Sequence, residues 1–555
     1  MFALTHAPQG SLLQTFSLKH QPLQHGKKVP RVSFENFSKS SFGMVSLTVG
    51  SIQSFSSSTT YVLLVLVVLF VIAAIWSMRI PTGLPPGPRG LPFIGSLGDL
   101  AKDPVSAITD LAKKYGDIYS LKVGRQQIVV LNNIELVREA LVRKQNAFAG
   151  RPGIYSFDLF SEGREDIVFG KFTPKWKSLR KIAHQAIRNY ASGHKLENLV
   201  TKEAFPRLKK AITDKNGTPF NPQPLLLLLV SNVMATMCFG HKYEVDDPEF
   251  KEILNFVKGL DESFGQGLVA DFISIFRYIP TRALRMFKQN INYWLMMIQS
   301  KVDDHKMKMR EGNVSDLIDD ILTIQAEAQA AGEDQADLLT DVNVRQAVSD
   351  VFGAGIGTTI NTLNWSVAYL VNYPDVQLKV QKEIDDVIGQ GRLPMLSDKG
   401  KLPYCEAVIH EVMRIRTVVP VGVPRETVEN TSVGGYNIPK GTQIWINLWK
   451  LHMDENFWKA PETFRPERFL DDDGKALPKQ DSFLPFSAGR RVCVGEVLAK
   501  NEMLLIFVCL FQQFTFLPAP GKEKPSLEPT FQILTTKCTP YDVIARERIS
   551  LELHV

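Results

Sequence analysis

One long apolar run near the N-terminus limits what this chain can fold into. Residues 40–78 carry no charged side chain, and their second half is almost wholly apolar. With its flanks, this run reaches the roughly 20 residues that a helix needs to span a bilayer. Tyr61 and Trp76 stand at the ends of the apolar half, where their rings favour the membrane interface, and the basic Arg79 follows. We expect a transmembrane anchor over residues 61–78, with its C-terminal side in the cytosol.

The leader before this anchor, residues 1–60, has a different composition. It holds five basic residues, one acid (Glu35) and many serines. This composition is typical of an organellar transit peptide, of a disordered extension, or of an upstream extension of a reading frame that starts at Met44. We expect the leader to be disordered. A cleaved signal peptide is the poorer interpretation, because the apolar run is too long and begins too far from the N-terminus.

Composition and charge exclude several classes for the rest of the chain. The 555 residues are 44% hydrophobic, with a mean hydropathy of −0.05, and one long apolar run stands out, which argues against a multi-span transporter. A net charge of +6 is too mild to indicate nucleic-acid binding. The five cysteines are widely spaced and odd in number, which indicates a reducing compartment rather than a disulfide framework.

The chain after the anchor divides into a short spacer and one large body. Residues 79–95 are rich in proline and glycine and fit a stiff spacer. Residues 96–555 contain no second linker of this kind and no internal repeat, so we expect a single domain. Helical segments dominate from about residue 104 to 390, and short strands are expected at 127–131 and within 420–450. The predicted fold class is mainly α with a small β region.

A second charge-free segment, residues 351–374, has the length of a membrane span. Its several glycine, threonine and asparagine residues make a buried helix through the middle of a large globule the better interpretation. Asp341 and Asn343 are available as N-terminal caps, and an Asn-Tyr dipeptide before Pro374 is a clear stop signal.

The residues around one cysteine carry the strongest functional signal. The pattern is Phe486-x-x-Gly489-x-Arg491-x-Cys493-x-Gly495, and an amphipathic helix follows it directly. A cysteine ahead of a helix gains thiolate stability from the helix N-terminus. The two glycines let the backbone approach a flat cofactor, Arg491 supplies a cation for an acidic substituent, and Phe486 covers the sulfur side. These are the requirements of a thiolate haem ligand.

This pattern resembles the haem-binding signature of the cytochrome P450 family, and the resemblance extends over roughly residues 80–545. It implies a mostly α domain with a small β region that holds haem b between a central helix and the cysteine loop, with the iron bound by the Cys493 thiolate. It also implies a monooxygenase that receives two electrons from NADPH through the flavoprotein NADPH-cytochrome P450 reductase, with cytochrome b5 as a further partner. One atom of dioxygen enters a C–H bond and the other leaves as water.

Haem-propionate ligands follow from the same resemblance. Trp176 and Arg180 are four residues apart, which puts the indole N–H and the guanidinium on one helix face. The spacing alone is commonplace, and the resemblance assigns both side chains to the propionates. Arg425 stands where the family often has another propionate ligand.

A buried ion-pair network is the second implied feature. Glu411 and Arg414 are an i, i+3 pair, and Arg468 follows roughly fifty residues later in the sequence Phe-Arg-Pro-Glu-Arg-Phe. The three resemble the family's structural Glu–Arg–Arg network. Buried charges must pair, so we expect loss of Glu411 or Arg414 to abolish haem incorporation rather than to tune activity.

The oxygen-activating part of the central helix is the third implied feature. Ala354 and Thr358 share a face that should look onto the distal side of the iron, and Thr358 is the residue expected to order a proton donor. The family usually has Asp or Glu just before this threonine, whereas this chain has Gly357. Proton delivery must then come through water, backbone or another side chain.

The anchor, spacer and haem loop are similar to the eukaryotic microsomal type, which implies a single-pass protein of the endoplasmic reticulum membrane with a cytosolic catalytic domain. Residues 151–176 resemble the steroid 17-alpha-hydroxylase/17,20-lyase group, and residues 265–280 lean toward the aromatic-hydrocarbon hydroxylases. Both groups use flat, apolar, multi-ring substrates. We favour the steroid-like side, hence steroid metabolism, with aromatic or xenobiotic oxidation as the alternative. Ala354 and Thr358 should contact substrate, and Phe157 and Phe264 either contact it or belong to the core.

Two alternatives of other classes remain at the level of the sequence. One is a haem-thiolate isomerase or lyase that works without a reductase, for which Gly357 is the argument. The other is a catalytically silent, membrane-anchored haem binder. Lysine and arginine residues near Arg490 fit either the docking face of an acidic reductase or an ordinary solvated surface.

Overall fold

A computed structural model describes residues 57–548, apart from 101–102, 192, 245, 266–267, 309–315, 331–338 and 533–534. Most of the predicted leader therefore lies outside the described residues. The chain divides into two compact units, residues 1–70 and 71–555. Everything below except helix α1 concerns the second unit.

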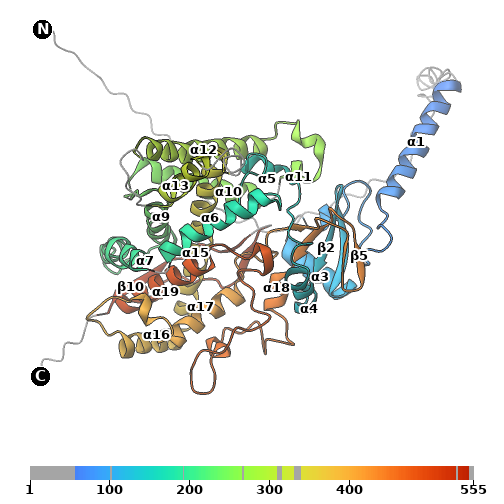
Figure 1. The fold of residues 1–555 in the computed structure, drawn as a ribbon. Coiled ribbons are helices and arrows are strands. Elements are labelled where there is room, and N and C mark those ends of the chain that lie inside the picture. Colours follow the sequence, from blue (N-terminus) through green and yellow to red (C-terminus); the bar gives the residue numbers. More distant parts are fainter. Residues whose placement is uncertain are drawn as a thin grey trace, which may run out of the picture. The chain divides into compact units, whose positions relative to one another are not determined.

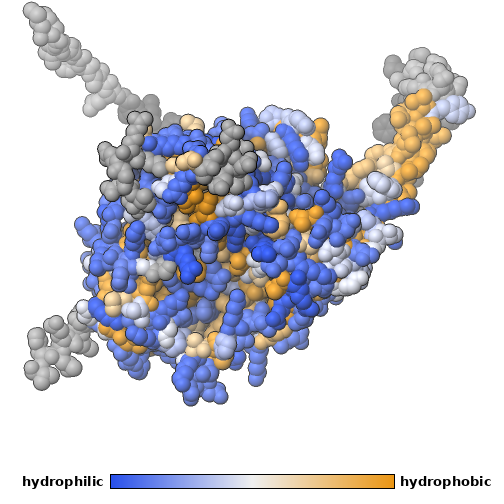
Figure 2. Space-filling model, viewed as in Figure 1, coloured by the Kyte–Doolittle hydropathy of each residue, from blue (hydrophilic) through white to orange (hydrophobic). Residues whose placement is uncertain are grey.

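Helix α1 (Ser57–Ser77) corresponds to the predicted anchor. Among the described residues, Thr60–Ser77 is the stretch long and apolar enough to cross a membrane, and none of it is buried in protein. Its exposed apolar surface is continuous along the helix (Figure 2). Exposure of such an apolar surface is unfavourable in water and favourable in the hydrocarbon core of a bilayer.

The second unit is mainly helical, as the sequence predicted (Figure 1). Its first helices are α2 (Leu97–Leu100), α3 (Pro104–Tyr115), α4 (Ile134–Arg138), α5 (Tyr155–Phe160), α6 (Pro174–Ala191), α7 (His194–Asn198), α8 (Phe205–Thr213), α9 (Gln223–Phe239), α10 (Pro248–Gly265) and α11 (Val269–Phe272). Next come α12 (Arg282–Lys308), α13 (Leu317–Ala330), α15 (Asp341–Asn372), α16 (Pro374–Val387), α17 (Pro403–Ile415), α18 (Leu448–His452) and α19 (Glu496–Gln513). Shorter helical turns are η1 (Glu139–Arg143), η2 (Leu199–Ala204), η3 (Ser274–Arg277), η5 (Leu396–Asp398), η6 (Pro466–Phe469) and η7 (Gly489–Arg491).

Helix α15 is the predicted buried helix, and it packs against α6, α9, α12, α17 and α19 (Figure 1). It ends at Asn372, and Pro374 opens α16, so the expected stop is confirmed. The expected N-terminal cap was partly wrong. Thr340 is the cap and forms a capping box with Asn343, whereas Asp341 is the first helical residue.

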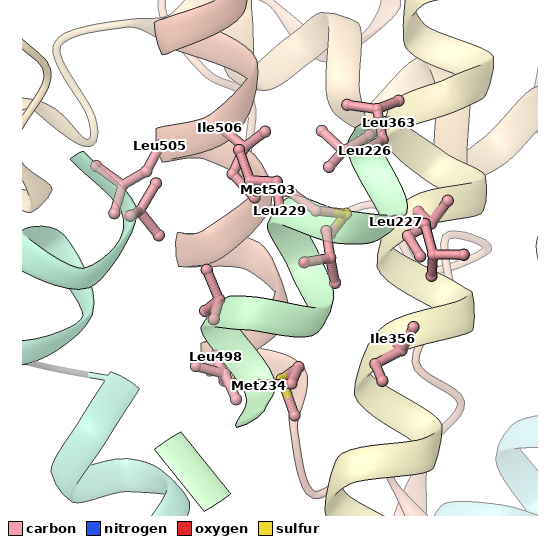
Figure 3. Close-up of a cluster of buried hydrophobic side chains, with 14 of the residues drawn as sticks. Leu226, Leu227, Leu229, Met234, Ile356, Leu363, Leu498, Met503, Leu505 and Ile506 are labelled. Atoms are coloured by element: carbon pink, nitrogen blue, oxygen red, sulfur yellow. The ribbon is translucent and has the colours of Figure 1, made fainter. Parts of the chain in front are cut away.

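One glycine of α15 lies against a side chain of α9. A Cβ on Gly355 would lie 2.3 Å from Cε of Met234, so a larger residue there would require the end of this flexible side chain to move. The interface continues into a large apolar cluster, which α9, α15 and α19 build together (Figure 3). Burial of this cluster accounts for much of the driving force that fixes the three helices.

The β region consists of short strands, as predicted. The main sheet has the order β1-β2-β6-β3, with β1 and β2 antiparallel, β2 and β6 parallel, and β6 and β3 antiparallel. Its strands are β1 (Ile118–Val123), β2 (Gln126–Leu131), β6 (Gln443–Ile446) and β3 (Arg425–Glu426). Three two-stranded sheets are formed by β4 (Thr431–Val433) with β5 (Tyr436–Ile438), β7 (Phe514–Pro518) with β10 (Val543–Glu547), and β8 (Pro529–Phe531) with β9 (Thr536–Cys538).

The predicted spacer, residues 79–95, is docked against β1 along its second half. Ser120 donates its N–H to the Pro86 carbonyl at 2.9 Å and its hydroxyl to the Pro85 carbonyl at 2.6 Å. A Cβ on Gly87 would lie 1.6 Å from the Ser120 carbonyl oxygen, so glycine permits this approach. The proline-rich segment thus ends as part of the body and is not a free linker.

Candidate functional site

A cavity of about 290 Å³ is lined by α15, by the loop before α19 and by residues of α6 and α9. Its wall is mostly apolar. The charged residues that line it are Arg151, Arg180, Arg425, Arg491, Asp350 and Glu502. The residues that line the cavity come from both halves of the sequence and include most of the predicted site residues.

Cys493 lines this cavity on the loop that runs from η7 into α19. The Cys493 N–H donates to the Phe486 carbonyl at 3.0 Å, which fixes the loop, and Phe486 lines the cavity beside it. The cysteine is surrounded by protein, yet solvent reaches it through the cavity. The sequence had therefore located a thiol that faces a binding space.

The protonation balance at Cys493 differs from the simple expectation for a helix N-terminus. Burial raises its pKa, and the carboxylate of Glu496 adds to the rise, while the Gly495 N–H and the Arg180 guanidinium lower it. Burial has the largest effect, so the net direction is upward. A thiolate at this position therefore requires a strong positive partner in the cavity.

The two glycines of the loop serve different purposes. Gly489 has a φ of +72°, and a Cβ there would lie 1.8 Å from the Leu141 carbonyl oxygen of η1. Gly489 does not line the cavity, so its expected role beside a flat cofactor is replaced by a close contact between two backbones. Gly495 does line the cavity, with open space beside it.

Arg491 is buried between the loop and α6. Its guanidinium donates to the carbonyls of Ala149, Ile167 and Gly170, at 2.8, 3.2 and 2.6 Å. It also lies 3.8 Å from the ring centroid of Trp176. Burial, followed by repulsion from neighbouring arginines, lowers the pKa of Arg491 to about 7.

Arg425 and Arg180, the two expected propionate-binding arginines, both line the cavity, and their contact with a propionate stays a prediction. Arg425 donates to the Ser487 hydroxyl and to the Ala488 carbonyl, and Arg180 donates to the Val492 carbonyl. Burial lowers the pKa of both, and for Arg425 repulsion from Arg151 and Arg180 adds to the decrease. Both guanidinium groups are therefore anchored to the cysteine loop.

Arg151 was not among the predicted site residues. It donates to the carbonyls of Val168, Val423 and Pro424, each at 2.8 Å, and burial lowers its pKa to about 10. A sequence signal was present, since Arg151 opens the segment, residues 151–176, that resembles the steroid 17-alpha-hydroxylase/17,20-lyase group. A single arginine in a loop gives no indication that it will be buried beside three others.

Trp176 lies at the edge of this arrangement. Its indole N–H donates to the Ile167 carbonyl at 2.9 Å, and the residue does not line the cavity. The side chain instead packs against Arg491 and Arg180. In this structure its N–H is already satisfied, and the expected contact with a propionate stays a prediction.

The peptide group of Ile167 connects three parts of the site, which the sequence did not indicate. Its carbonyl accepts from Trp176 and Arg491, while its N–H donates to Asp350 Oδ2 on α15 at 2.6 Å. Burial raises the pKa of Asp350, and repulsion from Asp166 adds to the rise. Burial also raises the pKa of Asp166, to about 7. The loop around Ile167 thereby links α15 to the cysteine loop.

The predicted face of α15 borders the cavity. Ala354 and Thr358 both line it, and the Thr358 hydroxyl donates to the Ala354 carbonyl at 2.9 Å. Gly357 is not a lining residue, and a Cβ there would meet nothing within 4 Å. Thr359 and Thr362, which the sequence analysis did not select, line the cavity as well.

The predicted ion-pair residues meet away from the cavity. Arg414 Nε lies 2.7 Å from Glu411 Oε2, and Arg468 Nε lies 2.9 Å from Glu411 Oε1. Arg414 also donates to the carbonyls of His452 and Pro461. Glu411 and Arg414 are fully buried, so each needs the other.

The two predicted phenylalanines have different outcomes. Phe157 is buried and stacks on Phe169 with ring centroids 4.0 Å apart, and it does not line the cavity. It belongs to the core. The side chain of Phe264 lies outside the described residues.

The donor set of the cavity fits a haem. Among the described residues, Arg151, Arg180, Arg425 and Arg491 form no ion pair with a carboxylate, although all four border one space. Buried cations need counter-charges, and a haem carries two propionates. The Cys493 thiol faces the same space and can supply an anionic ligand to iron.

Comparison with known proteins decides the family. The profile of the cytochrome P450 family matches residues 85–544. The chain belongs to the cytochrome P450 family. It is a haem-thiolate P450 monooxygenase, and its fold is the mainly helical fold of that family.

Two groups of curated P450s resemble this one. It is 37% identical over 473 residues to the steroid 17-alpha-hydroxylase/17,20 lyase of Ictalurus punctatus, which covers 84% of this chain and 92% of that protein. It is 36% identical over 459 residues to cytochrome P450 1A5 of Gallus gallus, covering 80% and 86%. A solved structure of a zebrafish cytochrome P450 with progesterone matches with a TM-score of 0.72 and 33% identity, covering 80% of this chain and 99% of that one.

Proposed function

We propose that Cys493 would supply the thiolate ligand of the haem iron in this P450, and that Arg151, Arg180, Arg425 and Arg491 would surround the propionates. The observation that carries this assignment is a group of three buried arginines and the half-buried Arg180, which form no ion pair among the described residues, beside a thiol that faces the same cavity. When bound, the haem activates dioxygen, so that one oxygen atom enters a C–H bond of the substrate and the other leaves as water. The chain's own residues position the reactants and handle protons.

Thr358 is proposed to hold the water that donates a proton. Its O–H already donates to the Ala354 carbonyl, so the lone pairs of Thr358 Oγ1 remain available as acceptors on the cavity side. A water that donates to Oγ1 would be oriented, with its other hydrogen free to donate. The open space beside Gly357 offers room for a further water, where the family usually has a carboxylate.

The proposed substrate is a flat, apolar, multi-ring molecule, with a steroid preferred. The wall beyond Ala354 and Thr358 is formed by Val351, Val418, Val419, Ile446 and Leu448. Such a wall binds through apolar area and provides few polar anchors. The relatives named steroid 17-alpha-hydroxylase/17,20 lyase and the zebrafish structure with progesterone favour the steroid. The relatives named cytochrome P450 1A5 and 1A1 favour an aromatic substrate as the alternative.

An optical titration tests the substrate class. Full-length protein with a normal CO-difference spectrum is titrated with pregnenolone, progesterone and planar polycyclic aromatics while the spin-state shift is recorded. We expect a saturable shift with the steroids, followed by product oxidised at carbon 17. A shift with the aromatics alone would instead support xenobiotic oxidation, and no shift with either would exclude both substrate classes.

A pair of variants ties that titration to the cavity. Ala354→Phe fills the space beside Thr358 and should abolish the steroid shift while the CO-difference spectrum stays normal. Ala326→Phe is the matched control, because Ala326 is exposed on α13. Equal shifts in both variants would mean that the steroid binds elsewhere.

The proposed electron source is NADPH-cytochrome P450 reductase, with cytochrome b5 as an accessory partner and the endoplasmic reticulum membrane as the location. The relatives of this chain and its apolar helix α1 support this arrangement. The exposed Arg490 near the cysteine loop is proposed to contribute to a basic docking face. Turnover that depends on NADPH and reductase distinguishes this function from the alternative of another class, a reductase-independent isomerase or lyase.

A further inference from the structure

Helix α19 carries a buried carboxyl group that the proposed chemistry does not use. Glu502 is 1% exposed and lines the same cavity as Cys493. It lies two helical turns beyond Gly495, on the face that also carries Leu498 and Ala499. Its Oε1 has no hydrogen-bond partner among the described residues.

Apolar side chains share the cavity wall with Glu502. Leu498 and Met503 on α19 and Met234 on α9 line the same cavity and belong to one cluster of buried hydrophobic side chains (Figure 3). Burial is the cause that raises the pKa of Glu502, to about 8. An acid that would be ionised in water is therefore neutral here at moderate pH.

Several charged groups on the elements that pack against α19 have partners other than Glu502. Arg180 on α6 donates to the Val492 carbonyl, and Asp350 on α15 accepts from Ile167 and Val168. On α17, Glu411 and Arg414 pair with each other, and burial lowers the pKa of His410 to about 4, so His410 is neutral.

Charged groups on the other elements that pack against α19 also have partners of their own. Arg207 pairs with Glu244, Lys209 with Gln513, Glu203 with Lys242 and Lys382 with Asp386, and Glu383 accepts from the N–H groups of Tyr404 and Cys405. Arg151, Arg425 and Arg491 line the same cavity, yet burial alone accounts for the raised pKa of Glu502. Its protonation therefore responds to charge that appears in the cavity itself.

We propose that Glu502, through the charge state of its carboxyl group, couples electron uptake at the bound haem iron to proton uptake from solvent. The inference rests on the proposed location of the haem in this cavity. With haem bound in this cavity, uptake of one electron from the flavoprotein donor would reduce ferric to ferrous iron and add one negative charge to the space that Glu502 borders. A nearby negative charge favours the protonated carboxyl. Within a limited pH range the Glu502 carboxylate then accepts one proton from water for each electron.

The reduction potential of the full-length haem protein tests this coupling. Spectroelectrochemical titrations from about pH 6 to about pH 10 should give a potential that falls with pH near the titration of Glu502. The slope is limited to about 59 mV per pH unit for one proton per electron. In Glu502→Gln, which keeps the shape but cannot ionise, the slope in this range should disappear.

A matched variant separates Glu502 from the other buried acid of the cavity. Asp350→Asn should keep the wild-type slope. A slope that persists in Glu502→Gln, that disappears only in Asp350→Asn, or that is absent from the wild type would overturn the proposal. Loss of the CO-difference band in otherwise folded wild-type protein would instead contradict the proposed haem site, so the two failures are distinguishable.

A measurement on the wild type keeps the test open if Glu502→Gln does not fold. Infrared difference spectra between reduced and oxidised protein should contain a carboxylic-acid C=O band that grows on reduction at a pH near the titration of Glu502. The band should shift in D₂O, because it belongs to a protonated acid. Its absence would overturn the proposal without any substitution.

Discussion

Gly357 stands directly before Thr358 on α15, with open space beside its Cα. A positioned acid speeds proton transfer by roughly 10²-fold or more, so the absence of a carboxylate at this position should matter for oxygen chemistry. Aspartate fits there, because a Cβ meets nothing within 4 Å. It also costs no helix stability relative to glycine.

We expect Gly357→Asp to raise the product formed per NADPH several-fold and to lower peroxide release. Gly357→Asn is the control that has the same shape without the acid, and it should behave like the wild type. Product, NADPH and peroxide are measured in the same reductase-supported assay. Equal improvement in both variants would assign the effect to packing rather than to proton delivery.

Among the four arginines that line the cavity, Arg151 is the one that the structure identified and the sequence did not select as a site residue. Its role as a counter-charge predicts that Arg151→Gln binds haem less tightly. A charged hydrogen bond contributes about 1.5–3 kcal/mol, so haem loss should accelerate roughly 10- to 100-fold. Haem transfer to apomyoglobin measures this rate. Arg143→Gln, at an exposed position, should leave it unchanged, and equal rates in both variants would contradict the role.

At the scale of elements, Glu411 connects α17 to η6. Removal of one partner from a buried ion pair costs about 3–5 kcal/mol, because the other charge remains without compensation. We expect Glu411→Gln to destabilise the fold by this amount and to reduce the haem content of purified protein. Thermal unfolding and the ratio of haem to protein absorbance measure both effects.

Glu462→Gln is the control for that experiment. Glu462 lies in the segment between α18 and η6, close in sequence to Arg468, but it is exposed and has no ion-pair partner among the described residues. It should retain normal haem content and stability. If Glu411→Gln also retained them, the network would be dispensable for folding.

Element-scale prediction from sequence succeeded where a local signal decides the structure. The stop of α15 before Pro374 was correct because proline disrupts a continuing helix. The cap was expected at Asp341 or Asn343 rather than at Thr340, because Asp, Asn and Thr are all good caps and the helix start depends on tertiary packing. The close approach of Gly489 to Leu141 could not be predicted, since the two are far apart in sequence.

At the scale of the whole molecule, we expect α1 to determine whether the protein stays in the membrane. We expect full-length protein to resist alkaline carbonate extraction from membranes, because residues 60–77 provide a spanning apolar helix. A chain that begins at Thr82 should be extracted, while one that begins at Met44 should stay in the pellet. Immunoblots of pellet and supernatant give the result. A carbonate-resistant Thr82 form would mean that another part of the chain inserts.

The sequence by itself determined the family and the fold class, and it predicted the anchor and the cysteine ligand, because each is carried by a contiguous pattern. It also selected Arg180, Arg425, Ala354 and Thr358, which line one cavity. Only the tertiary structure decided that Arg151 and Glu502 border that cavity and that Gly489 does not. The physical reason is burial: a side chain's charge state and partners depend on segments distant in sequence, which no local pattern specifies.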